Sequence, residues 1–253
     1  MAKVVLAILA HPDDAEFLCA GTLIRLQREQ GWQVHIASMT PGDCGSAEHD
    51  AEAIAAIRRR EGATAAELIG GTYHCMEERD LCVFYAEPVV KKVTKLLREV
   101  RPEIVFTHSP SDYMLDHEMT SQVVRAACFN APIPLFLKGE GEPLKHIPTL
   151  YYCDPIEGKD PLGQDIPPQF CVDITDVIQQ KVDMLACHAS QREWLLKHHG
   201  MDQYLKAVRD WGTERGKSCG VAYAEGFRQH LGHSYPQENI LGKLLGSLAY
   251  QGN

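Results

Sequence analysis

The sequence predicts an α/β fold of the Rossmann-like kind, in which a mostly parallel sheet is flanked by helices. Short apolar runs, such as residues 4–9, alternate along the chain with longer segments that repeat apolar residues at helical spacing. This alternation indicates parallel strands joined by right-handed crossovers. In addition, polar residues directly follow two of the apolar runs, and an open parallel sheet carries its chemistry at the carboxyl ends of its strands.

The individual elements follow from apolar spacing and from the residues that end each segment. For example, the first helical segment carries Phe17, Ala20 and Ile24 on one face and ends at Gly31, a common helix C-cap. The expected strands are residues 3–10, 33–39, 72–76, 103–108, 149–153 and 170–172. The expected helices are residues 16–30, 49–69, 88–100, 117–129, 173–189 and 202–211, the last followed by a glycine-rich tail.

The chain is expected to form a single domain over residues 1–253, because it shows no internal repeat, low-complexity tract or linker. Residues 130–168 differ from the rest, since eight of the fourteen prolines fall there together with several glycines. Such a segment cannot be mostly helical. We expect it to be an excursion over the face that carries the site, or a contact between subunits.

Composition excludes several classes of protein. The formal net charge of −9 argues against a nucleic-acid surface, and the only dense basic run, Arg58–Arg60, is typical of a solvated helix face. No apolar stretch approaches the roughly 20 residues of a membrane span, and residues 4–9 are too short for a signal peptide. Nine cysteines without a Cys-x-x-Cys pair favour free thiols in a reducing compartment. We therefore expect a cytoplasmic protein.

Two strand ends carry a set of histidines and aspartates. His11 and Asp14 follow the first strand, and Asp116 and His117 follow the loop after a later strand that can lie beside it. Two imidazoles and one carboxylate, with a fourth position left for water, are the ligand set of a catalytic zinc site. Nitrogen donors favour zinc over magnesium or calcium, and zinc-bound water has a pKa near about 7.

The neighbouring carboxylates have two possible interpretations. Asp13 can take a proton from water and return it to a leaving amine, and Asp116 can accept a hydrogen bond from a nearby histidine ring. Alternatively, Asp13, Asp14 and Asp116 each precede an expected helix, where an aspartate is more often an N-cap than a ligand. Capping explains neither imidazole, so the metal site is preferred.

The run His11-Pro-Asp-Asp-Ala-Glu16 together with Asp116-His117 resembles the zinc-dependent LmbE/PIG-L deacetylases, which remove acetyl groups from N-acetylglucosamine-type amides. The loop over residues 40–45, the pattern over residues 58–70 and His188-x-Ser-Gln191 are also similar to segments of this family.

The resemblance implies a Rossmann-like fold, a Zn²⁺ cofactor and commonly a homo-oligomer. It assigns His11, Asp14 and His117 as metal ligands and Asp13 as the general base. Asp43 and Arg58 correspond to positions that line the family's substrate pocket. The alternative to this role is that Asp43 is an ordinary turn residue and Arg58 an ordinary surface arginine.

One departure from the family concerns its usual His-Pro-Asp-His motif, where the first histidine polarises the amide carbonyl or protonates the leaving group. Met114 stands there in this chain, and a thioether cannot donate a proton. Three explanations remain open. Another histidine, such as His233, His230 or His108, enters the pocket; zinc alone polarises the carbonyl; or most of the activity is lost.

The sequence thus predicts a zinc-dependent amidohydrolase that deacetylates an N-acetylated amino sugar or a glycoside of one. The alternative is a metal-binding family member with weak or lost activity that binds a sugar or another ligand. Other enzyme classes find no support, because the chain has neither the Gly-x-Gly-x-x-Gly of dinucleotide binding nor a Gly-x-Ser-x-Gly elbow.

Overall fold

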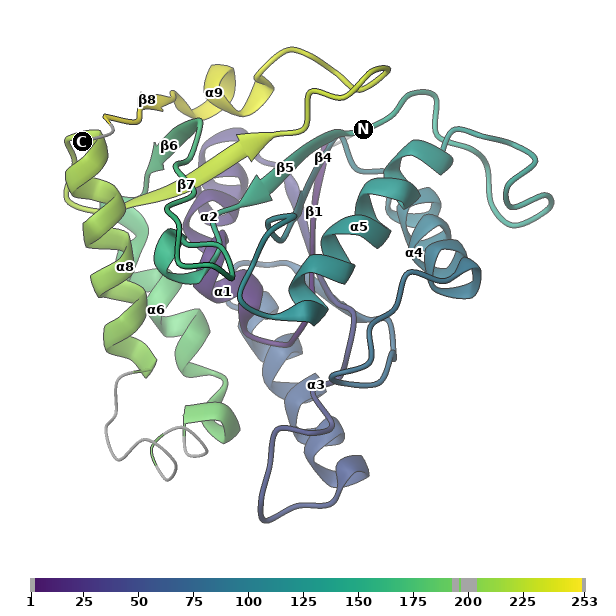
Figure 1. Ribbon diagram of the computed structural model, residues 1–253, viewed down its shortest axis with the longest axis horizontal. Coiled ribbons are helices and arrows are strands. Elements are labelled where there is room, and N and C mark those ends of the chain that lie inside the picture. Colours follow the sequence, from purple (N-terminus) through teal and green to yellow (C-terminus); the bar gives the residue numbers. More distant parts are fainter. Residues whose placement is uncertain (1–2, 193–195, 197–203, 252–253) are drawn as a thin grey trace.

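An eight-stranded sheet lies at the centre of the computed structural model (Figure 1), which describes residues 3–192, 196 and 204–251. The strand order is β3-β2-β1-β4-β5-β7-β6-β8. The strands are β1 (Val4–Leu9), β2 (Gln33–Ser38), β3 (Thr72–Cys75), β4 (Ile104–Thr107), β5 (Thr149–Cys153), β6 (Phe170–Asp173), β7 (Ala224–Gln229) and β8 (Leu248–Ala249). The first five strands pair in parallel, whereas β7, β6 and β8 add antiparallel pairs.

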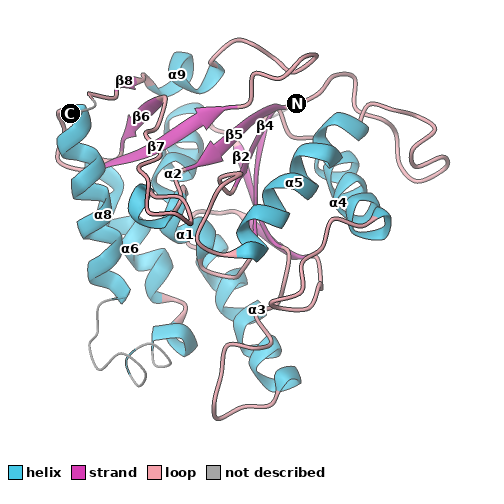
Figure 2. Ribbon diagram, viewed as in Figure 1, coloured by secondary structure: helices cyan, strands magenta, loops and turns pink. Residues whose placement is uncertain are grey.

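Helices cover both faces of this sheet (Figure 2). One apolar core lies under α1, α2, α3, α6 and α9, and the other lies under α4 and α5. The helices are α1 (Asp14–Leu18), α2 (Ala20–Gln30), α3 (Ala51–Glu67), α4 (Glu87–Val100), α5 (Leu115–Asn130), α6 (Ile178–Ala186), α8 (Tyr204–Cys219) and α9 (Ile240–Leu245). Within the described ranges, no helix is both long and apolar enough to cross a membrane.

The predicted Rossmann-like fold is confirmed, and the parallel half of the sheet matches the expected elements closely. The strands β1 to β5 and the helices α3, α4 and α5 each begin and end within two residues of the expected ranges. The β1 strand is buried on both faces apart from its first residue, which explains its continuous apolar run. Apolar spacing was sufficient for most of these elements because they are buried against their neighbours, whereas β3 at the edge of the sheet is only partly buried.

The first helix differs from the prediction because it is broken in two. The backbone at Cys19 (φ −142°, ψ 3°) leaves the helical region, so α1 ends at Leu18 and α2 begins at Ala20. Because of this break, α1 and α2 are two separate helices and not one continuous helix. The end of α2 is as predicted, because Gly31 adopts a left-handed conformation (φ 66°) and its N–H bonds to the carbonyls of Leu26 and Gln27.

The prediction for the C-terminal third is wrong in several respects. The expected helix over residues 173–189 is a 3-10 turn (Thr175–Val177) followed by the shorter α6, with the Asp173 side chain accepting hydrogen bonds from Thr175 at the turn. The glycine-rich tail instead supplies β7, which lies inside the sheet between β5 and β6. The expected helix start at Asp202 falls outside the described residues, and α8 extends to Cys219.

The proline-rich segment is divided in two by β5. Its first part, residues 131–148, lies at the amino edge of the parallel strands, where the Arg98 guanidinium donates to the carbonyls of Ala131, Ile133, Leu137 and Glu140. Its second part, residues 154–169, leads from the carboxyl edge of β5 back to the start of β6. Only this second part starts at the edge that carries the predicted site.

A disulfide joins Cys171 and Cys219, with their Cα atoms 6.6 Å apart. This contradicts the expectation of free thiols for these two residues, whereas the other seven cysteines are free. The pair lies 48 residues apart, on β6 and at the end of α8, and it shows no spacing motif. Only the folded topology brings these thiols together, so their spacing in the sequence carried no signal.

We expect Glu225→Ala to destabilise the protein by about 3–5 kcal/mol, because it leaves a buried ammonium unpaired. The Glu225 carboxylate accepts hydrogen bonds from the Gly21 N–H (2.9 Å), the Thr22 N–H (2.8 Å) and the Thr22 hydroxyl (2.6 Å), and Lys181 Nζ lies 2.5 Å from it. Both charged residues are buried. Urea unfolding measures the free-energy change.

The matched control is Glu214→Ala, which breaks an exposed ion pair with Lys217 on α8. Exposed pairs of this kind contribute about 0–1 kcal/mol. Equal losses for the two variants would show that the buried Glu225 pair does not stabilise the junction of α2, β7 and α6.

Candidate metal centre

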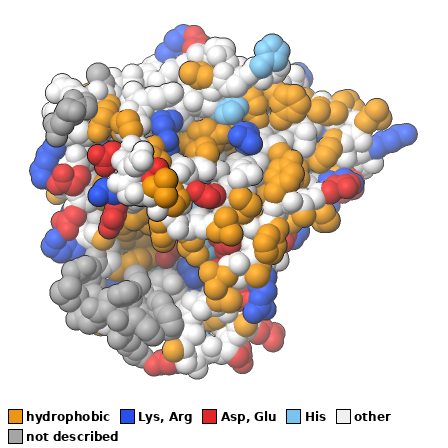
Figure 3. All heavy atoms as spheres, in the orientation of Figure 1, with side chains coloured by type: hydrophobic (Ala, Val, Ile, Leu, Met, Phe, Trp, Pro, Cys, Tyr) orange, Lys and Arg blue, Asp and Glu red, His pale blue; other side chains and the backbone are white. Residues whose placement is uncertain are grey.

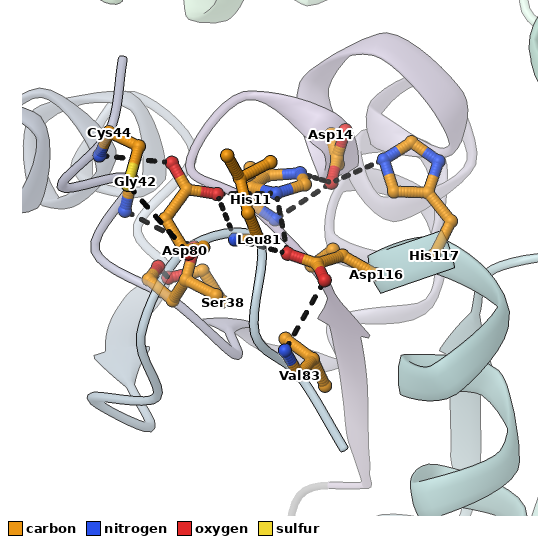
Figure 4. A network of polar contacts seen from close by, with 12 residues as sticks. His11, Asp14, Ser38, Gly42, Cys44, Asp80, Leu81, Val83, Asp116 and His117 are labelled. Atoms are coloured by element: carbon orange, nitrogen blue, oxygen red, sulfur yellow. Dashed lines mark hydrogen bonds and ion pairs between the residues drawn. The ribbon is translucent and has the colours of Figure 1, made fainter. Parts of the chain in front are cut away.

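The predicted ligands meet at the carboxyl edge of the two neighbouring strands β1 and β4. His11 follows β1, Asp14 opens α1, and His117 lies in the first turn of α5 (Figure 4). Asp14 Oδ2 lies 3.2 Å from His11 Nδ1 and 3.6 Å from His117 Nε2. One potential ligand atom from each of these three residues lies within 4.8 Å of the others. The structure therefore brings together the three side chains that the sequence singled out.

Three further aspartates hold the two imidazoles in place. The His117 Nδ1 lies 2.9 Å from Asp112 Oδ1, and His11 Nε2 lies 3.1 Å from Asp80 Oδ1 and 3.5 Å from Asp116 Oδ2. A carboxylate that accepts a hydrogen bond from one ring N–H fixes the tautomer and leaves the other nitrogen free for a metal. This arrangement presents His11 Nδ1 and His117 Nε2 toward Asp14.

The electrostatics of the cluster favour positive charge between the side chains. Burial works to lower the pKa of His11, but hydrogen bonds to Asp116, Asp14 and Asp80 hold that pKa well above its ordinary value. Burial works to raise the pKa of Asp14, but the neighbouring rings of His117 and His108 and a hydrogen bond with His11 hold it well below the ordinary carboxyl value. The carboxylates therefore favour a positive charge among them, which a protonated His11 or a bound cation can supply.

Asp13 lies beside the cluster in a strained backbone conformation. Its φ of 107° is in the region that favours glycine, and such strain is often found at functional sites. The Tyr204 hydroxyl donates to Asp13 Oδ2 at 2.7 Å, and an Arg58 nitrogen lies 3.6 Å from Asp13 Oδ1. Burial raises the pKa of Asp13, and the charge of Arg58 opposes that rise. The carboxylate is thus held in one orientation, with raised basicity.

The two predicted substrate residues both contact the protein itself. Arg58 is only 3% exposed, and it donates to the Pro12 carbonyl at 2.7 Å. A Cβ at Gly42 would lie 2.0 Å from the same guanidinium, so the Gly42 turn leaves just enough space for it. Asp43 Oδ1 accepts the Asp80 N–H at 2.8 Å, which connects the loops after β2 and β3. Both side chains therefore hold the backbone of the loops around the site in place.

The three histidines considered as replacements for the missing donor have different positions. His108 is fully buried, with Nε2 3.0 Å from Asp14 Oδ2 and its ring stacked on His117. Burial and the charge of His117 lower the pKa of His108 to about 4, so this ring is neutral near pH 7. His230 and His233 line a different pocket with Arg125, because β7 runs antiparallel and ends at the opposite edge of the sheet. The structure does not bring His233 to the cluster.

Sequence reasoning missed three residues that complete the site. Tyr204 lies within the expected helix over residues 202–211 and belongs to no motif, although its hydroxyl contacts Asp13. Asp112 precedes His117 by five residues in a polar loop, a separation that a ligand search over helical spacings does not test. Asp80 comes from the loop after β3, which had no motif at all. Among these, only Asp112 carried a usable signal, as an acid close to a candidate ligand.

Comparison with known proteins gives a family match for residues 6–128, to the model described as PIG-L, GlcNAc-PI de-N-acetylase. This range includes all three predicted ligands, Asp13, and the three aspartates that hold the imidazoles.

Two characterised relatives cover most of the chain. The 4-oxalmesaconate hydratase of Pseudomonas putida is 25% identical over 240 residues, which span 89% of this chain and 88% of the relative. The diacetylchitobiose deacetylase of Thermococcus kodakarensis is 28% identical over 239 residues, which span 89% and 82% of the two chains.

Among solved structures, the N,N'-diacetylchitobiose deacetylase from Pyrococcus horikoshii superimposes with a TM-score of 0.75 and 27% identity. The match covers 94% of this chain and 89% of that one.

Proposed function

Because the chain belongs to the PIG-L/LmbE family, we propose that it is a zinc-dependent hydrolase that removes the acetyl group from an N-acetylated amino sugar or a conjugate of one. The single observation that carries this proposal is the convergence of His11, Asp14 and His117 beside a partly buried, oriented Asp13. The deacetylase relatives support the reaction class. The homo-oligomeric state and the cytoplasmic location remain predictions.

The side chains fit zinc better than a hard cation. Two imidazole nitrogens and one carboxylate oxygen are typical of a catalytic zinc site, whereas magnesium and calcium prefer oxygen ligands. Asp112 gives His117 the hydrogen-bonded support that such ligands require, and Asp80 lies 3.1 Å from His11 Nε2. When bound, zinc would polarise the amide carbonyl and make water more acidic.

The protein's own residues supply the proton transfers. Asp13 accepts a proton from the attacking water as the new carbon–oxygen bond forms, and it returns that proton to the sugar nitrogen as the carbon–nitrogen bond breaks. Tyr204 and Arg58 keep the carboxylate in position for both steps. Met114 at the start of α5 offers no proton, so this account assigns both proton transfers to Asp13.

We expect Tyr204→Phe to lower kcat by about tenfold to a hundredfold with little change in KM. The variant removes only the hydroxyl that donates to Asp13, and hydrogen bonds to charged groups contribute about 1.5–3 kcal/mol. Steady-state kinetics of acetate release separate the two parameters. The matched control is Tyr250→Phe, close to the last described residue. An equal fall in kcat for this variant would show that the Tyr204 hydroxyl has no specific role at Asp13.

Acetate release tests the proposed function directly. The zinc-loaded protein is incubated with N-acetylglucosamine, with N,N'-diacetylchitobiose and with glycosides of N-acetylglucosamine, and acetate and free amine are measured together. Equal amounts of the two products support deacetylation. Stoichiometric zinc without acetate from any of these compounds would instead support the ligand-binding alternative.

Hydration of a carbon–carbon double bond is a second candidate, favoured by the Pseudomonas putida relative and by Met114, because hydration has no amine leaving group to protonate. Against it, the aspartates that surround the site disfavour a polycarboxylate substrate, and the buried Arg58 already donates to the Pro12 carbonyl. Loss of ultraviolet absorbance from 4-oxalmesaconate, without acetate release from any sugar, would favour hydration over deacetylation.

A further inference from the structure

Large apolar side chains lie exposed beside the groups that bind or orient the metal ligands, on the loop after β3 and at the start of α5. Leu81, Tyr113 and Leu115 are each about three-fifths exposed, at 61%. We propose that these three residues, here termed the apolar rim, bind an apolar substituent on the substrate, such as an alkyl or aryl aglycone on the amino sugar. This inference rests on the proposed function and narrows its substrate class.

Leu81 is held at the site by strained backbone. Its φ of 63° is unfavourable for leucine, and its N–H lies 2.8 Å from Asp116 Oδ2, the carboxylate that also faces His11. Asp80 Oδ1 accepts from the same N–H at 3.0 Å. The network that orients a metal ligand therefore also fixes where the leucine side chain meets solvent (Figure 4).

Tyr113 and Leu115 come from the loop that carries the last ligand. The Tyr113 ring lies edge-on to the His117 ring, with centroids 5.4 Å apart. Leu115 is the first residue of α5 and directly precedes Asp116. All three rim residues are thus within one residue, or one ring contact, of groups that bind or orient the metal ligands. The rim adjoins the reaction site directly.

Among the described residues, several charged side chains at the site are already engaged by the protein itself, although Arg79 beside Asp80 is exposed. Arg58 donates to backbone carbonyls, Asp43 and Asp80 accept backbone N–H groups, and Asp116 accepts from the loop after β3. The space-filling view shows apolar side chains over α5 and the loop before α4 (Figure 3). Apolar contact with these exposed side chains can therefore add binding energy for the substrate, in proportion to the apolar area that it removes from water.

The test compares methyl and hexyl glycosides of N-acetylglucosamine as substrates of the zinc-loaded enzyme, below the micelle concentration. We expect kcat/KM for the hexyl glycoside to be at least about tenfold higher, because the longer chain adds several methylenes that the rim can bury. In the double variant Leu81→Asn, Leu115→Gln this ratio should fall toward one. Asparagine is chosen for position 81 because it tolerates a left-handed backbone.

Leu135→Gln is the matched control, since Leu135 is 80% exposed at the amino edge of the sheet. It should keep the wild-type ratio. A ratio near one in the wild type overturns the inference, and so does a change in subunit number in the double variant, which would make the rim a contact between copies. If neither glycoside releases acetate, the proposed function fails. Calorimetry still tests the rim, because equal Kd values for the two glycosides would overturn it.

Discussion

Replacing Asp13 with asparagine is expected to lower kcat for acetate release by about 10²–10⁴-fold, while the protein keeps its zinc. Asparagine has the same shape and can still accept from the Tyr204 hydroxyl, but it cannot take up a proton. General acid–base catalysis contributes a factor of this size. Steady-state kinetics and elemental analysis of the same preparation measure both quantities.

The matched control is Asp50→Asn. Asp50 caps α3 by accepting the Ala53 N–H, and asparagine is an equally good cap. This variant should therefore keep its rate, its zinc and its stability. A nearly unchanged rate for Asp13→Asn would remove Asp13 as the base, and a loss of zinc would mean that it binds the metal.

The part of the site that could be predicted from sequence is the part that lies next to strand ends. His11 and Asp14 directly follow a buried strand, and His117 opens the helix after another strand, so the topology of a parallel sheet places them at one edge. Local sequence and topology are sufficient here, because each ligand lies within a few residues of a strongly patterned element.

The supporting residues depend on contacts between distant segments, and these leave no pattern in a single sequence. Tyr204 lies 191 residues from Asp13, and Asp80 lies 69 positions after His11, in a loop without regular structure. Arg58 is a clear case. In sequence it belongs to a basic run typical of a solvated face, yet folding buries it against the Pro12 carbonyl.

The strand β7 shows a second limit of sequence reasoning. Its residues, Ala224–Gln229, include glutamate, glycine and arginine, so they lack the apolar run that identified β1 and β4. The strand is nevertheless buried, because Glu225 is neutralised by Lys181 and bonds to the start of α2. Polar residues with buried partners are therefore indistinguishable, in one sequence, from the polar residues of a surface tail.

We expect His117→Ala to abolish stable zinc binding and, with it, acetate release. His117 supplies one of three ligands and is itself only 1% exposed, so water cannot readily replace the ring without reorganising the cluster. Competition against a chromophoric chelator measures the Kd for zinc, and acetate assays at saturating zinc measure the remaining rate. His146→Ala, at an exposed position at the amino edge of the sheet, should bind zinc like the wild type.

We expect Asp112→Asn to bind zinc with an affinity between those of the wild type and His117→Ala. Asp112 does not reach Asp14 but accepts from His117 Nδ1 at 2.9 Å, and loss of such a partner costs about 10–100-fold in metal affinity. From tightest to weakest, the order of zinc affinities should therefore be wild type, Asp112→Asn, then His117→Ala.

Unchanged zinc binding in His117→Ala would contradict the proposed centre. It would instead indicate a site at Asp43, Cys44 and Asp80, which could also hold one ion. Because these three residues lie on the loops after β2 and β3, zinc there would not depend on α5, and the graded response to Asp112 would disappear as well.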